Sequence, residues 1–63
     1  EAAKEAALSH AGLTAEQVSK LKAKYDYDDG YALYEVEFEC NGYEYEYEID
    51  AATGAILKYE IDD

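Results

Sequence analysis

One segment of this chain specifies its structure more clearly than any other: YEVEFECNGYEYEYEI, residues 34–49. Apolar residues alternate with glutamates on both sides of Asn41-Gly42. This period of two is typical of strands with one buried face and one solvated face. Asn-Gly supplies the two positive φ angles that a type I′ turn requires. The segment therefore predicts a β-hairpin with an aromatic face and a glutamate face.

A second turn signal, Asp29-Gly30, predicts a further strand ahead of this hairpin, beginning near Lys20. If these two residues form the loop, Leu21 lies opposite Phe38 on the aromatic face. On the other face three lysines meet three glutamates, with Lys20, Lys22 and Lys24 opposite Glu39, Glu37 and Glu35. Both faces agree with one register, which supports the pairing.

A third turn signal, DAATG at residues 50–54, predicts the last hairpin. A loop at residues 52–54 with Gly54 left-handed places Ile49 opposite Leu57. The four predicted strands then follow one another as an antiparallel meander.

The first eleven residues are good helix formers and predict a helix that Gly12 ends. A helical wheel places His10 and five alanines on the face toward the sheet: Ala2, Ala3, Ala6, Ala7 and Ala11. The same wheel places Leu8 on the solvent side. Thr14 and Gln17 have the spacing of a capping box, which predicts one short helical turn. The predicted fold is α+β: residues 1–63 form a single domain, with the N-terminal helix packed on one face of a four-stranded antiparallel meander sheet.

Composition excludes several classes of function. The formal net charge of the chain is −11, from sixteen acidic residues against five lysines, and nucleic-acid binding requires a basic patch instead. The sequence has no apolar run long enough for a membrane span, so we expect no membrane insertion. It also shows no basic start followed by an apolar segment, so we expect no signal peptide in this chain.

The candidate interaction face consists of six glutamates that share the solvated side of the central hairpin. We call these residues the glutamate face: Glu35, Glu37, Glu39, Glu44, Glu46 and Glu48. The predicted register places them opposite one another in like-charged pairs, which is unfavourable. The face is either a surface for a basic segment or for cations, or a solvated surface that serves solubility. It lacks the cleft, nucleophile and oxyanion donors of a catalytic site, so we expect no enzyme activity, no catalytic residues and no cofactor.

Three further features carry weaker signals. Cys40 falls on the apolar side of its strand, which favours a buried thiol, with an intermolecular link as the alternative. His10 has no second histidine or cysteine with which to share a metal, so we expect a partly buried, hydrogen-bonded side chain. Residues 26–30, DYDDG, loosely resemble a calcium loop, but the glycine comes one position early and a hairpin is needed there.

Several of these segments together resemble a PepSY domain. The similarity extends over essentially the whole chain, and its most specific parts are YEVEF (residues 34–38) and YEIDAATG (residues 47–54). The resemblance implies a helix on an antiparallel sheet and an extracellular or cell-envelope location. It also implies a role in inhibiting or regulating peptidases. Two positions depart from the family pattern: Ala6 stands where a larger aliphatic residue is common, and Cys40 stands where cysteine is not expected.

The sequence and the resemblance together predict a non-enzymatic interaction domain that binds a peptidase or another cell-envelope protein. The contact would use the glutamate face or an exposed strand edge. The competing prediction is a structural subunit that self-assembles, through a β-strand edge or through Cys40.

Overall fold

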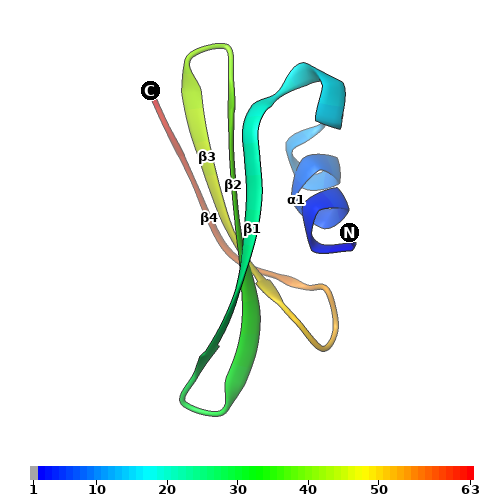
Figure 1. The fold of residues 1–63 in the computed structure, drawn as a ribbon, viewed down its shortest axis with the longest axis vertical. Helices are drawn as coiled ribbons and strands as arrows, with labels where there is room; N and C mark the ends of the chain where they lie inside the picture. Colours follow the sequence, from blue (N-terminus) through cyan, green and yellow to red (C-terminus); the bar gives the residue numbers. More distant parts are fainter. Residues whose placement is uncertain (1) are drawn as a thin grey trace.

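The computed structural model describes residues 2–63 and, of Asp28, only the backbone. One α-helix precedes one short 3₁₀ turn and four strands (Figure 1). The elements are α1 (Ala2–Ala11), η1 (Ala15–Gln17), β1 (Ser19–Asp28), β2 (Tyr31–Cys40), β3 (Tyr43–Asp50) and β4 (Ile56–Asp62). The strands pair in the order β1-β2-β3-β4, and every pair is antiparallel. The predicted α+β meander is confirmed, although residue 1 of the predicted helix lies outside the described residues.

The two-residue turns have the predicted left-handed conformation. Asn41 and Gly42 have φ angles of 55° and 83°, and Asp29 and Gly30 have φ angles of 51° and 83°. Positive φ at both central residues is the requirement of a type I′ turn, which matches the twist of the flanking strands. These turns set the register of the first two hairpins.

The register of the central hairpin is confirmed in full. Phe38 pairs with Tyr45, Val36 with Tyr47, and Tyr34 with Ile49. Because directly paired residues share a face, this register collects the aromatic and aliphatic side chains on one side of the sheet.

The first hairpin follows its predicted register from the turn back to Lys22, which pairs with Glu37. Beyond that point the predicted pairing is wrong, because Ser19 rather than Lys20 pairs with Glu39. Lys20 has a φ angle of 56°. The extra residue makes a β-bulge, so Leu21 does not pair with Phe38 as predicted.

The third hairpin also contains one irregularity. Lys58 pairs with Glu48 as expected, but Ile49 pairs with Ile56 and not with Leu57. The loop is longer than predicted, because β3 ends at Asp50 and β4 begins at Ile56. The Asp50 carboxylate accepts hydrogen bonds from the N–H groups of Ala52 (2.7 Å) and Thr53 (3.2 Å), and Gly54 has the predicted positive φ of 80°.

The helix turns most of the predicted face to the sheet, with Ala3 and Ala7 buried and Ala6 and Ala11 packed against the core, but two positions differ. Leu8, predicted on the solvent side, is buried together with Ala3 and Ala7. Ala2, predicted to be buried, is exposed. A stripe of alanines offers little apolar area, so the helix is oriented to bury its one large aliphatic side chain as well.

The core lies between α1 and the centre of the sheet. Its largest fully buried side chains are Tyr47, Phe38, Ile49 and Val36. α1 packs against β1, β2 and β3. The hairpin of β1 and β2 extends beyond the helix (Figure 1). The opposite face of the sheet has no helix over it and carries the glutamate face.

Candidate functional site

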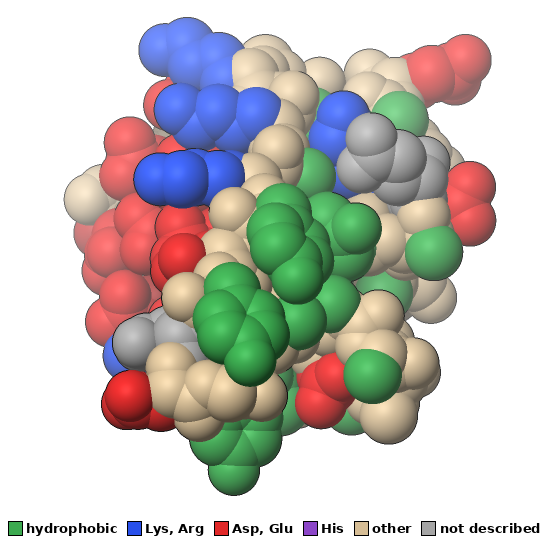
Figure 2. Space-filling view, turned by 60° about the horizontal axis from the view of Figure 1, so that its bottom comes forward, with side chains coloured by type: hydrophobic (Ala, Val, Ile, Leu, Met, Phe, Trp, Pro, Cys, Tyr) green, Lys and Arg blue, Asp and Glu red, His purple; other side chains and the backbone are tan. Residues whose placement is uncertain are grey.

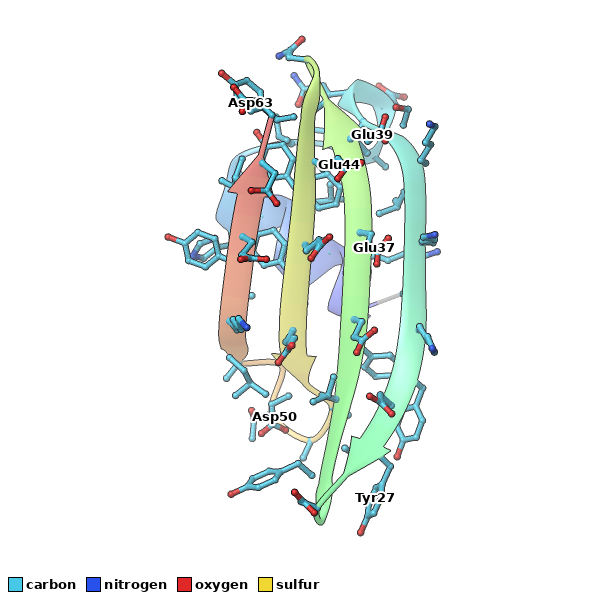
Figure 3. All side chains as sticks on the ribbon, turned by 90° about the vertical axis from the view of Figure 1, so that its left-hand side faces the viewer. Tyr27, Glu37, Glu39, Glu44, Asp50 and Asp63 are labelled. Carbon is cyan, nitrogen blue, oxygen red and sulfur yellow. The ribbon has the colours of Figure 1, made fainter. Side chains whose placement is uncertain are left out.

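The glutamate face is assembled by two strands, β2 and β3. Glu37, Glu39 and Glu44 project from these strands on the side turned to the viewer in Figure 3, and α1 lies behind the sheet. Since every second residue of a strand points to the same side, the alternation in the sequence is sufficient to place all six glutamates together.

The predicted like-charged pairs are present. In the register of β2 and β3, Glu35 pairs with Glu48, Glu37 with Glu46, and Glu39 with Glu44. The neighbouring strand β4 adds an acidic residue beside two of these pairs, with Glu60 opposite Glu46 and Asp62 opposite Glu44. Asp62 was not among the predicted site residues, although extending the register of β3 and β4 by one step identifies it.

Lysines border this acidic surface on two sides. In β1, Lys20 lies 3.6 Å from a carboxylate oxygen of Glu39, and Lys22 lies 3.6 Å from one of Glu37. Both lysine side chains are about three-quarters exposed, at 75% and 73%, so these ion pairs are well solvated and contribute little. Lys58 of β4 pairs with Glu48 on the far side. Figure 2 shows the red carboxylate surface directly beside the blue row of lysines.

Glu46 experiences this charge distribution most strongly. Its pKa is raised above the ordinary glutamate value, first by partial loss of solvent on the sheet surface and then by the negative charges of Glu37, Glu60, Asp62 and Glu44. No lysine of β1 pairs with β3, so nothing on that flank offsets these charges directly. The centre of the face therefore carries an unfavourable concentration of negative charge.

Two shallow depressions, each of about 170 Å³, lie between the side chains of this face. The first is lined largely by charged residues of β2, β3 and β4: Glu35, Glu37, Glu46, Glu48, Lys58 and Glu60. The second lies toward β1 and includes Lys20, Lys22, Glu39 and Glu44. Each has room for a side chain of a peptide. Their carboxylates can accept hydrogen bonds and hold positive charge.

Within the described part of the chain, no group of three or more acidic, histidine or cysteine side chains is arranged to hold a metal ion. Asp29 and Gly30, in the segment that resembles a calcium loop, form a hairpin turn as predicted.

Cys40 and His10 lie on the other face of the sheet. Cys40 is a free thiol with 8% of its surface exposed, which confirms the predicted burial. The Nδ1 atom of His10 and the hydroxyl of Tyr47 form a hydrogen bond of 3.0 Å. His10 is thus hydrogen bonded as predicted, although the residue is exposed rather than partly buried. Burial raises the pKa of the Tyr47 hydroxyl, and the neighbouring Tyr59 and Tyr45 add to this shift.

The fold is that of a small α+β domain. One face of its sheet is acidic, and its edge strands are β1 and β4. The family model described as "Peptidase propeptide and YPEB domain" matches residues 1–60, and the chain belongs to this PepSY family. The resemblance seen in the sequence is thereby confirmed. Domains of this family accompany peptidase propeptides, are generally non-catalytic and are typically extracellular or associated with the cell envelope.

Two curated proteins are similar to the chain. The uncharacterized protein Spy1430 of Streptococcus pyogenes serotype M6 is 41% identical over 56 residues, which cover 89% of this chain and 43% of that protein. The uncharacterized protein YkoJ of Bacillus subtilis strain 168 is 44% identical over 64 positions, which cover the whole chain and 35% of that protein. The chain therefore spans less than half the length of these relatives. No solved structure matches it significantly. No helix among residues 2–63 has the length and apolar character needed to cross a membrane.

Proposed function

We propose that this domain is a non-enzymatic, extracytoplasmic binding module that captures a basic segment of a peptidase or another envelope protein on its glutamate face. Binding in trans would regulate the captured protein by covering that segment. Membership of the PepSY family supports the association with peptidases. The glutamate face supports the choice of a basic partner.

One observation carries this proposal: the glutamates of β2 and β3 lie opposite one another in three like-charged pairs, and lysines of β1 and β4 lie only at the borders of this surface. Like charges placed directly opposite destabilise a sheet. A surface that served solubility alone would not need its carboxylates in opposed pairs. A ligand with positive charge between the two rows would turn each repulsive pair into two attractive contacts.

The spacing of the glutamates favours a ligand in an extended conformation. Successive glutamates on one strand are two residues apart, which corresponds to roughly 7 Å along the sheet. An extended peptide with lysine or arginine at every second position has the same repeat. Such a peptide would lie between the two glutamate rows, and its basic side chains would reach the two depressions.

The proposal is tested with two synthetic peptides of identical composition. One has lysine and threonine in strict alternation, and the other has its lysines clustered at one end. Calorimetric titration should show tighter binding of the alternating peptide, and the affinity should fall steeply with added salt because exposed charges are screened.

Matched variants locate the surface. The double variant Glu37→Gln with Glu46→Gln should weaken binding of the alternating peptide by about tenfold or more, since each lost charge contact contributes up to roughly 1 kcal/mol. The control is Glu5→Gln with Glu16→Gln, which removes the same charge from exposed positions outside the sheet. Equal losses in both variants would mean that only net charge matters, and the glutamate face would then not be the site.

The regulatory part of the proposal has its own assay. Adding the domain to a thermolysin-type metallopeptidase should lower peptidase activity, and the Glu37→Gln and Glu46→Gln variant should restore it. If the domain binds the peptide but does not affect the peptidase, the proposed binding function stands and the peptidase is not its target.

A further inference from the structure

The two edge strands of the sheet differ in how they are protected against pairing with another chain. β1 contains the bulge at Lys20, which interrupts its regular pairing with β2. It also carries three lysines on one face, namely Lys20, Lys22 and Lys24. Bulges and lysines are common protections of natural edge strands. The β1 edge is therefore poorly suited to accept a further strand.

The β4 edge lacks comparable protection. Its irregularity lies at its start, and the pairing with β3 is regular from Lys58 to Asp62. Lys58 is the single lysine of this strand. In Figure 3, β4 forms one margin of the sheet and β1 forms the other. A strand of this kind offers unpaired backbone N–H and C=O groups to a partner.

β4 also presents an apolar stripe on the side of the sheet that carries α1. Leu57, Tyr59 and Ile61 are 50%, 51% and 48% exposed. The helix packs against β1, β2 and β3 and reaches β4 through His10, whose ring centre lies 4.8 Å from that of Tyr59. These three apolar side chains of β4 therefore remain about half in solvent.

We propose that β4 is a homodimerisation edge, on which a second copy of this chain docks its own β4 antiparallel across a two-fold axis at Tyr59. This edge adjoins the surface proposed to bind basic peptides, because Lys58 and Glu60 also line the first depression. In this register Tyr59 meets Tyr59 of the second copy, Leu57 meets Ile61, and Lys58 meets Glu60. The two sheets join into one continuous eight-stranded sheet, since each copy contributes four strands.

Charge complementarity selects this register and this partner. Side chains directly opposite in an antiparallel pair share a face, so an allowed register can shift only in steps that keep apolar opposite apolar. A two-fold axis at Lys58 would place the two lysines opposite each other. An axis at Glu60 would place two glutamates opposite each other beside two Lys58–Asp62 contacts, so it keeps a repulsive pair that the axis at Tyr59 avoids. The axis at Tyr59 instead gives a Lys58–Glu60 contact twice, because a two-fold interface repeats every contact.

The high net charge sets the conditions under which the dimer forms. Two copies of charge −11 repel each other, and this long-range repulsion is screened within about 8 Å at an ionic strength of about 0.15 M. Dimerisation should therefore strengthen as salt is added from low ionic strength. Binding of a basic peptide to the glutamate face should weaken under the same change, so the two proposals can fail independently.

The experiment is sedimentation velocity over a range of protein concentrations, with two single variants and their mixture. Lys58→Glu and Glu60→Lys each place like charges opposite one another in the dimer, so each variant alone should sediment as a monomer. When the two variants are mixed, the new carboxylate of one faces the new lysine of the other. The mixture should therefore dimerise with an affinity within about threefold of that of the wild-type protein.

Two further comparisons separate loss of the dimer from loss of folding. Glu60 pairs with Glu46 within one copy, so Glu60→Lys should stabilise the monomer while it prevents dimerisation. Lys24→Glu makes the same charge change as Lys58→Glu on the protected β1 edge and should leave the dimer intact. A wild-type protein that remains monomeric at millimolar concentration and moderate salt overturns the proposal. So does a dimer that survives in both single variants, or a mixture that stays monomeric.

Discussion

The tyrosines on the helix side of the sheet fall into two groups that the alternating sequence does not distinguish. Tyr47 is 2% exposed, whereas Tyr25 and Tyr27 are 55% and 66% exposed. This difference in exposure arises because α1 is shorter than the strands that it packs against. A ten-residue helix such as α1 spans about 15 Å, whereas a ten-residue strand such as β2 spans about 33 Å. The helix therefore buries one part of the face and leaves the rest in water (Figures 1 and 2). Alternation decides which face a side chain joins, and the helix decides how deeply it is buried.

The largest test of this difference is Tyr47→Ala against Tyr27→Ala. Removing the buried ring of Tyr47 should lower the free energy of unfolding by about 3–5 kcal/mol, because it leaves a cavity among Phe38 and Ile49. The same change at Tyr27 should stay within about 0.5 kcal/mol. Urea denaturation followed by circular dichroism measures both. Similar losses at the two positions would mean that the exposed tyrosines are held in place by contacts of their own.

Cys40 gives a second test of the difference between buried and exposed positions on the helix side of the sheet. Its surface is 8% exposed, whereas that of Tyr43, its partner across the hairpin, is 44% exposed. A buried thiol reacts after local opening, and in so small a domain we expect opening to cost about 2–3 kcal/mol. A thiol reagent should therefore label the native protein about 30- to 150-fold more slowly than the urea-unfolded protein. Equal rates would contradict the burial and favour an exposed, linking cysteine.

The space between α1 and the sheet is tested by replacing an alanine of the helix with a larger residue. Ala6 is partly buried and packs against the core, whereas Ala2 is exposed. Ala6→Leu should raise the free energy of unfolding by about 1 kcal/mol, as cavity-filling changes commonly do, and Ala2→Leu should have little effect. Thermal unfolding of the two variants gives the comparison. A lower melting temperature for Ala6→Leu would show that α1 already lies too close to the sheet for a larger side chain.

The smallest expected effect lies on the other face of the same strands. The pKa of Glu46 is raised in the folded protein, so the folded state binds more protons than the unfolded state as the pH falls through this pKa. The penalty of the charged form is therefore present at neutral pH and is relieved in mild acid. Glu46→Gln should raise the melting temperature at pH 7 by up to about 3 °C, and the variant should gain less than the wild type on acidification.

Glu16→Gln is the control for this change, because Glu16 is exposed and lies outside the sheet. It should leave the melting temperature and its pH dependence unaltered. A lower melting temperature for Glu46→Gln at neutral pH would show that the glutamate face is not repulsive. The proposal of a basic ligand on that face would then be abandoned.

Most of the candidate surface could be predicted from the sequence, because it depends on strand alternation and on one turn. Asn41-Gly42 sets the register of β2 and β3, and that register alone places Glu37 opposite Glu46. The exposed apolar stripe of β4 could not be predicted in the same way. Tyr59 and Ile61 have the alternation of buried residues, and their exposure depends on where α1 lies across the sheet.

The sequence by itself determined the features that depend on neighbouring residues: the left-handed turns, the side of the sheet each strand residue joins, and the cross-strand pairs next to the two-residue turns. Positive φ angles at the two central residues of a turn and a period of two along each strand are sufficient for these features. The tertiary structure decided the bulge at Lys20, the longer loop after Asp50, and the burial of Leu8 in place of Ala2. These depend on how a short helix crosses a longer, twisted sheet, because a strand far from its turn adjusts its pairing to the packing above it.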